Sequence, residues 1–130
     1  MREILFRGKR LDNGAWETGS LVIVRMDCHD AQYYIADKMT GYRTPVDPST
    51  VGQYTCLKDK NGKRIFEGDI AKVLQGKDKD IAYVGFENGA FMLYPKTGNI
   101  YERTLWEYWY NDWDVEVIGN ITDNPELLEK

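Results

Sequence analysis

The sequence predicts a mainly β fold, because it is rich in aromatic residues, in glycines and in short apolar runs. Seventeen of its 130 residues are Phe, Trp or Tyr, side chains that favour strands over helices. Twelve glycines and three Asn-Gly pairs supply turns between these strands. We expect a small N-terminal β-sheet unit over residues 1–50. Residues 51–130 are expected to form an SH3-like, partly open β-barrel with short helical turns, packed with the first unit as one compact chain.

Composition and hydropathy indicate a cytoplasmic protein. Hydrophobic residues make up 42% of the chain and charged residues 29%, which suits a packed core. The longest apolar run, residues 21–24, is far shorter than the roughly 20 residues of a membrane helix. The N-terminus has no apolar stretch typical of a signal peptide. We therefore expect no membrane partner and reduced thiols at Cys28 and Cys56.

The pair Asn13-Gly14 predicts a first hairpin with a two-residue loop. Four apolar residues then share one face of the hairpin, which we expect to face the core. The opposed pairs in this register are Leu11 and Trp16, Arg10 and Glu17, Phe6 and Leu21, and Ile4 and Ile23.

Residues 33–36 predict a third short strand, and the prolines that follow interrupt regular structure. Asp47 precedes Pro48, a pattern typical of an N-cap with proline at the first helical position. We expect a single helical turn there. It marks the boundary between the two units.

The second pair, Asn61-Gly62, predicts a hairpin in which Leu57 faces Phe66 and Asp59 pairs with Arg64. Directly after it, Gly68-Asp69 leads into an apolar strand. We expect Gly68 to supply an unusual φ and Asp69 to turn or cap the backbone.

The third pair, Asn88-Gly89, has the clearest alternation on either side. It sets Val84 and Phe86 against Leu93 and Phe91, and Tyr83 against Tyr94. We expect the side with more aliphatic residues to face the core.

Thr104 and Glu107 form a Thr-x-x-Glu capping box, which predicts a short helix ending near Tyr110. A last strand over residues 115–121 and a capped turn beginning at Pro125 complete the chain.

Three segments, REILFRGKRLDNGAWETG, VDPSTVGQYTCLKDKNGKRIFEGDI and VEVIGNITDNPELL, resemble the YopX-like family of phage and prophage proteins. The resemblance covers nearly the whole chain. It implies a small, mostly β protein encoded by a phage or prophage and acting in the cytoplasm of a bacterial host. It implies no activity, substrate or cofactor. Where the family pattern usually has Tyr-Thr-Gly-Leu this chain has Cys56, from which we expect that φ at this position need not be positive.

Residues with catalytic or metal-binding chemistry form no convincing group. Cys28 and His29 are adjacent, so their side chains diverge on an extended chain. A structural zinc site needs about four Cys or His ligands, and the chain has three such residues. Alternating acids at Asp112, Asp114 and Glu116 suit a solvent-exposed strand face better than a cation site. We expect no catalytic residues, no cofactor and no metal.

Five large aromatics within eight residues are the best candidate for an interaction surface, because Trp and Tyr dominate binding hot spots. Acids beside them would repel phosphates, so protein contact is favoured over nucleic acid, while core packing of some of them stays open. The five are Trp106, Tyr108, Trp109, Tyr110 and Trp113.

The leading functional hypothesis is a non-enzymatic protein-interaction module that self-associates into a homo-oligomer or binds a protein partner. Its two ends carry opposite charge: residues 1–10 have four bases and one acid, a net +3, and residues 107–130 have seven acids and one base, a net −6.

The alternative is a nucleic-acid-binding small β-barrel, which the net charge of −4 disfavours. An enzyme using two carboxylates is a third hypothesis with less support. The bases available to nucleic acid are Lys58, Lys60, Lys63, Arg64 and Lys72.

Overall fold

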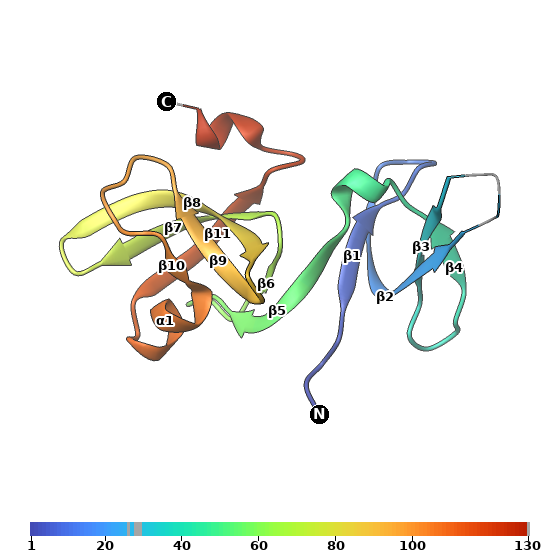
Figure 1. Cartoon of the computed structure of the whole chain (residues 1–130), viewed down its shortest axis with the longest axis horizontal. Coiled ribbons are helices and arrows are strands. Elements are labelled where there is room, and N and C mark those ends of the chain that lie inside the picture. The colour runs from blue at the N-terminus through green and yellow to red at the C-terminus, as the bar shows by residue number, and fades with distance from the viewer. Residues whose placement is uncertain (26, 28–29, 130) are drawn as a thin grey trace. The chain divides into compact units, whose positions relative to one another are not determined.

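The chain divides into two compact units, residues 1–54 and residues 55–130, in a computed structural model that describes residues 1–25, 27 and 30–129. Figure 1 traces the strands of both units along the chain. The two units divide between Tyr54 and Thr55, whereas the sequence predicted a boundary between Thr50 and Val51. None of the helices in the described residues is long and apolar enough to cross a membrane.

The first sheet is six-stranded, in the order β4-β3-β2-β1-β5-β6. A short 3₁₀ helix, η1, lies between β4 and β5. The strands and this helix are β1 (Phe6–Lys9), β2 (Trp16–Val24), β3 (Gln32–Ala36), β4 (Arg43–Pro45), η1 (Pro48–Thr50), β5 (Gly52–Lys58) and β6 (Arg64–Phe66).

The second sheet is five-stranded, in the order β10-β9-β8-β7-β11, so the last strand lies beside the first. Its elements are β7 (Asp69–Gln75), β8 (Asp78–Glu87), β9 (Ala90–Pro95), β10 (Arg103–Thr104), α1 (Leu105–Tyr110), β11 (Asp114–Asn120) and η2 (Pro125–Leu128). The mainly β fold is confirmed. The sheets formed by the described residues are not closed into a barrel, and SH3-like topology stays a prediction.

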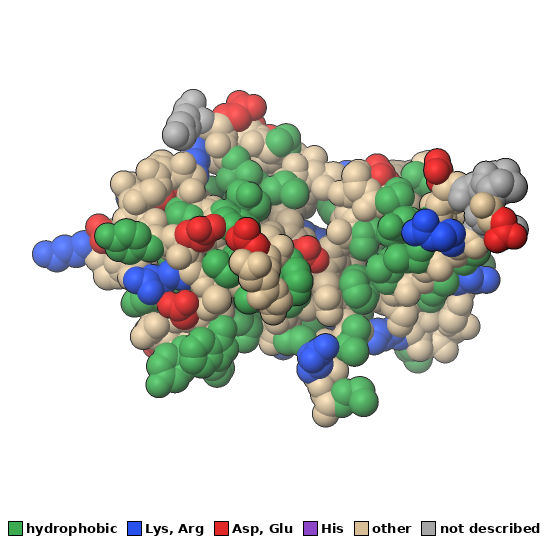
Figure 2. All heavy atoms as spheres, in the orientation of Figure 1, with side chains coloured by type: hydrophobic (Ala, Val, Ile, Leu, Met, Phe, Trp, Pro, Cys, Tyr) green, Lys and Arg blue, Asp and Glu red, His purple; other side chains and the backbone are tan. Residues whose placement is uncertain are grey.

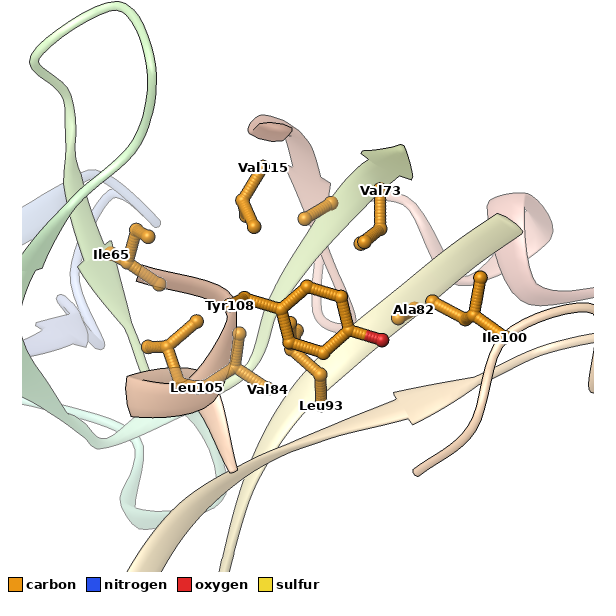
Figure 3. Packing of buried hydrophobic residues seen from close by; sticks show 10 residues of the cluster. Ile65, Val73, Ala82, Val84, Leu93, Ile100, Leu105, Tyr108 and Val115 are labelled. Atoms are coloured by element: carbon orange, nitrogen blue, oxygen red, sulfur yellow. The ribbon is translucent and has the colours of Figure 1, made fainter. Parts of the chain in front are cut away.

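One face of the second sheet carries the core of its unit. Strand alternation sends every second side chain to that face, and α1 adds Leu105 and Tyr108 from above. Tyr108 is fully buried, and its ring lies among the aliphatic side chains in Figure 3. The cluster consists of Ile65, Ala71, Val73, Ala82, Val84, Leu93, Ile100, Leu105, Tyr108 and Val115.

The hairpin at Asn88-Gly89 has the predicted register. Both turn residues have positive φ, 53° and 82°, as a type I′ turn requires. Phe86 lies opposite Phe91, and Tyr83 opposite Tyr94. The aliphatic side is buried at Val84, as expected, while Phe86 at the hairpin end is exposed.

The register predicted for the first hairpin is wrong. Arg10 N–H donates to the carbonyl of Ala15 at 2.8 Å, which leaves a four-residue loop over residues 11–14. Of the Asn13-Gly14 pair only the glycine has positive φ, so the turn is not type I′. Lys9 therefore faces Trp16 in the register of β1 and β2. The Arg10 side chain still forms an ion pair with Glu17 at 3.1 Å.

The core face predicted for this hairpin is also wrong. Ile4 is 44% exposed and Ile23 is 48% exposed, whereas Leu5 is buried. The buried residues of the first unit include Ile35 on β3 and Val46 after β4. β4 itself was not predicted because it contains Pro45, yet it lies at the edge of the sheet beside β3, where proline is tolerated. The predicted turn at Pro48 is confirmed: Asp47 accepts a bond from Ser49 N–H at 3.0 Å.

The second hairpin corrects the pairing of Asp59 with Arg64. Asp59 N–H donates to the carbonyl of Lys63, one residue away from the predicted partner. The Asp59 carboxylate is buried and accepts bonds from three backbone N–H groups, those of Asn61 and Lys63 at 2.9 Å and of Val117 at 3.0 Å. It therefore joins the hairpin to β11.

The turn at Gly68-Asp69 has the predicted form. Gly68 has φ of 90°, and the buried Asp69 carboxylate accepts a bond from Phe66 N–H at 2.7 Å. At the C-terminus the proline turn is present as η2, but Asn124 does not cap it. The Asn124 side chain instead accepts a bond from Asn120 N–H at 3.2 Å.

Cys56 contradicts the expectation of an unstrained backbone, because its φ is 70°. The left-handed region costs a residue with a Cβ roughly 1–2 kcal/mol. Cys56 is exposed, so its side chain gains little from burial that could offset this cost.

Replacing Cys56 by glycine is expected to raise the free energy of unfolding by about 1 kcal/mol, because glycine adopts φ near 70° without strain. Urea unfolding of Cys56→Gly and Cys56→Ala measures this. The alanine variant removes the thiol but keeps the strain, so it is the matched control. Equal stability of the two variants would contradict strain at this position.

The carboxylates of Asp59 and Asp80 are expected to make stability depend on pH. Burial alone would raise the pKa of each group, but the bonds that each accepts outweigh burial and hold both pKa values below normal. Stability from these groups is thus present above the unfolded value of about 3.9 and lost as pH falls through the lower folded values.

Urea unfolding between pH 7 and pH 3 tests this dependence. Asp59→Asn is expected to cost about 1–3 kcal/mol at pH 7, because an amide nitrogen cannot accept from a backbone N–H. The Asp59→Asn and Asp80→Asn variants should lose less stability on acidification than the unchanged chain. Asp78→Asn, at an exposed position of β8, is the control, and an equally flattened profile there would refute the assignment.

Candidate functional site

The capping box at the start of α1 is formed as predicted. Thr104 Oγ1 accepts a bond from Glu107 N–H at 3.2 Å and donates to the Glu107 carboxylate at 3.2 Å. Arg103 forms an ion pair with the same carboxylate at 3.0 Å. The bond from Arg103, reinforced by those from Thr104, holds the pKa of Glu107 below its usual value. These contacts fix the helix start.

Three large aromatic side chains project from this short helix. Leu105 and Tyr108, three residues apart, face the core. Trp106 between them and the two aromatics after Tyr108 point outward. Trp106, Trp109 and Tyr110 are 54%, 58% and 67% exposed, and we call them the aromatic surface. Figure 2 shows hydrophobic side chains gathered at the position of α1.

Within the aromatic surface, Trp106 and Tyr110 stack on each other. Their ring centroids are 4.9 Å apart and their planes are inclined by 21°. The spacing of four residues places both rings on the same side of the helix. This pair therefore presents a broad apolar area to solvent.

Two residues of the predicted interaction surface, Tyr108 and Trp113, lie deeper than the other three. Tyr108 is buried, and its hydroxyl donates to the carbonyl of Tyr101 at 3.2 Å. Burial raises its pKa. Trp113 is half-buried and meets the Tyr108 ring edge to face at 5.1 Å. Both rings act in packing.

An apolar hollow of about 390 Å³ adjoins the aromatic surface at Trp106. Its two threonine hydroxyls are already engaged: Thr55 donates to the carbonyl of Ile65 at 2.8 Å, and Thr104 belongs to the capping box. No lining residue carries a charge. The hollow suits an apolar group and offers no acid or base. It is lined by Thr55, Leu57, Gly89, Ala90, Phe91, Thr104, Leu105 and Trp106.

The bases predicted for nucleic acid are all exposed but fall on different elements. Lys58, Lys60, Lys63 and Arg64 belong to the hairpin of β5 and β6, where Lys60 lies 4.0 Å from Glu116. Lys72 lies on β7 and lines a separate hollow.

The residues considered for metal binding or thiol chemistry form no such site among the described residues. Cys28 and His29 lie outside the described residues. Glu116 accepts a bond from the side chain of Asn61 at 3.3 Å. Within the described part of the chain there is no group of three His, Cys, Asp or Glu residues able to hold a metal ion.

Two lysines that the sequence interpretation missed line the same hollow as Lys72. They are Lys79 on β8 and Lys96 after β9. Extending the register of the Asn88-Gly89 hairpin places Lys96 opposite Ile81, so the sequence could have located Lys96 on the same face as Ile81. No such signal marked the hollow beside Trp106, because residues from three distant segments line it.

Comparison with known proteins agrees with this architecture. A family model described as YopX protein matches residues 5–129. Protein EF1440 from Enterococcus faecalis is similar in structure, with a TM-score of 0.61 and 23% identity, over 99% of this chain and 100% of that one. Protein YopX from Bacillus subtilis has a TM-score of 0.59 and 22% identity, over 96% and 98% of the two chains. The search of curated proteins gave no match.

Removing the helix cap is expected to destabilise the unit that carries the aromatic surface. Thr104→Ala should cost about 1 kcal/mol, since alanine leaves the Glu107 N–H without its acceptor. Thr104→Ser retains the hydroxyl and serves as the control. Urea unfolding followed by tryptophan fluorescence compares the two, and an unchanged midpoint for the alanine variant would contradict the capping role.

Proposed function

The chain belongs to the YopX protein family, and we propose that it is a non-enzymatic, phage- or prophage-encoded interaction module that self-associates through the aromatic surface. The observation that carries this proposal is the exposure of Trp106, Trp109 and Tyr110 on one short helix. Tryptophan and tyrosine supply much of the binding energy at protein interfaces.

The aromatic surface is suited to a second copy of itself because projecting rings and a receiving hollow adjoin each other. An interface with twofold symmetry uses the same patch on both subunits, so that patch must complement itself. Trp109 or Tyr110 of one copy has the apolar character needed to enter the hollow beside Trp106 of the other. Phe91 and Leu105 would contact the inserted ring.

Charge at the aromatic surface disfavours a nucleic-acid partner. Residues 107–130 carry a net −6 and residues 1–10 a net +3. Opposite charges on two copies attract over about 10 Å at moderate ionic strength. A nucleic acid would be repelled by Asp112 and Asp114 near the end of α1.

The size of the aromatic surface limits the expected affinity between two copies. Each ring buries about 150–250 Å² when fully covered, and roughly half of each is exposed here. Three rings then contribute about 300 Å² per copy, well below the roughly 800 Å² per partner of a stable interface. We expect a dimer that dissociates at tens of micromolar or above.

A non-enzymatic role is supported by the lining of the hollow beside Trp106. The lining residues carry no nucleophile with an adjacent base and no pair of carboxylates. Its side chains can hold an apolar group by shape alone.

Sedimentation equilibrium over a wide concentration range tests self-association. The unchanged chain is expected to show a monomer–dimer equilibrium, and the double variant Trp106→Ala/Trp109→Ala should weaken it at least about tenfold. Both positions are largely exposed, so the variant is expected to fold, which circular dichroism checks.

Tyr42→Ala is the matched control, since Tyr42 is an exposed aromatic of the first unit. It should leave the equilibrium unchanged. A monomer at all concentrations, or equal weakening by both variants, would overturn the proposal.

A further inference from the structure

Three lysines meet on the outer face of the second sheet, the face opposite the core. Lys72 on β7 lies directly across from Ile81 on β8, and Lys96 N–H donates to the Ile81 carbonyl at 2.7 Å. Lys72, Ile81 and Lys96 thus form one row across neighbouring strands about 4.8 Å apart. Lys79 precedes Ile81 by two residues, so its side chain is on the same face.

These lysines border a hollow of about 330 Å³, within the size range of small-ligand sites. Among the described residues, neither Lys72 nor Lys79 forms an ion pair. Glu116, opposite Lys72 on β11, lies 4.0 Å from Lys60. The Lys96 ammonium group donates to the carbonyl of Leu127 at 3.3 Å, which holds it near the sheet.

Asp80 is the one acid lining the hollow, and its charge is already satisfied. Its carboxylate accepts bonds from the N–H groups of Ile81, Thr97 and Asn99 and from the Thr97 hydroxyl, at 2.8 to 3.2 Å. It is buried and fixes the turn after β9. Three ammonium groups against this one acid leave a net positive hollow, which attracts an anion.

Two tyrosines lie on the same face, one row further along. Tyr83 and Tyr94 are opposite each other, with ring centroids 5.0 Å apart. The Tyr94 ring lies over Gly85, because a Cβ built at Gly85 would be 2.4 Å from Tyr94 Cε2. This glycine lets the ring lie against the sheet. Tyr83 is 37% exposed and offers a surface on which a planar base can stack.

We propose that this outer face binds a nucleotide unit, free or within a single strand, with its phosphate at Lys72, Lys79 and Lys96 and its base against Tyr83. The ammonium groups explain recognition of the phosphate, and the tyrosines distinguish a nucleotide from a plain anion. The apolar side chain of Ile81 lies between the lysines and the tyrosines.

Acids near the tyrosines limit how much of a strand can bind. Glu87 accepts a bond from the Tyr94 hydroxyl at 3.0 Å. Burial, this bond and the charges of Glu87 and the exposed Glu102 raise the pKa of Tyr94 to about 12. Three lysines neutralise one or two phosphates. The logarithm of affinity should therefore fall with the logarithm of salt concentration with a shallow slope, about −0.7 to −1.4.

Fluorescence anisotropy with labelled twelve-residue oligothymidylate, at low and moderate salt, measures binding by the full chain. Thymidine monophosphate and inorganic phosphate compete in separate arms. We expect competition by both, with the nucleotide at least about tenfold better because stacking adds to the phosphate contact. If the oligonucleotide binds much more tightly than the mononucleotide, the natural ligand is a nucleotide within a single strand.

Lys72→Gln/Lys96→Gln retains the aliphatic stems and should reduce affinity at least tenfold. Lys58→Gln/Lys63→Gln makes the same charge change on the β5–β6 hairpin and is the matched control, with an expected change below twofold. Tyr83→Ala should weaken the nucleotide but leave inorganic phosphate unchanged. Circular dichroism verifies folding of each variant.

No binding at low salt would overturn the proposal, as would equal effects of the two lysine pairs. Equal competition by phosphate and nucleotide would reject the base contact. If polyglutamate competes as strongly as the oligonucleotide, the site binds anions in general and does not select nucleotides. Each result is independent of the oligomeric state, so it leaves the proposal of self-association unaffected.

Discussion

The arrangement of the second unit follows from one constraint: a strand sends alternate side chains to opposite faces, and α1 lies on only one face of the five-stranded sheet. On the covered face the side chains of Val73, Ala82 and Leu93 are fully buried. On the other face, polar and aromatic residues alternate with them. The core and the outer lysine–tyrosine row are therefore products of the same pleat.

The same constraint explains why α1 exposes so many rings. A helix of six residues has room for few inward positions, and Leu105 and Tyr108 occupy them. Tyr108 fills the centre of the core with one large ring whose hydroxyl reaches the carbonyl of Tyr101. With the core filled, Trp106, Trp109 and Tyr110 have no inward position left. The proposed self-association would remove part of this exposed apolar area from water.

Prediction from sequence succeeded where one local signal decides the structure. The Thr104 capping box, the Pro48 turn and the Asn88-Gly89 hairpin each depend on residues close in the chain. It failed where the same signal allows several geometries. Asn-Gly accommodates loops of different length, and only at residues 88 and 89 do both residues take positive φ. The other two registers depend on contacts from distant strands, such as the bond from Val117 to Asp59.

The candidate sites show the same limit. An aromatic-rich segment could be located from the sequence, but which rings face outward could not, because this depends on the orientation of α1 against the sheet. Cys56 shows a subtler failure: replacement of a glycine suggested a relaxed backbone, yet the fold retains φ of 70° and the cysteine bears the strain. Asp59 joins the hairpin tip to β11 through the bonds that it accepts from Asn61 and Val117.

The two surfaces of the second unit differ in chemistry in a way that favours separate ligands. The aromatic surface adjoins an uncharged hollow and lies next to Asp112 and Asp114, so it selects against anions. The outer face has three lysines around Ile81, against the single negative charge of Asp80, whose carboxylate is held by its own hydrogen bonds. Local charge thus outweighs the net −4 of the whole chain, since screening confines each field to about 10 Å. A chain with acidic overall composition can therefore carry one surface for a protein and another for a phosphate.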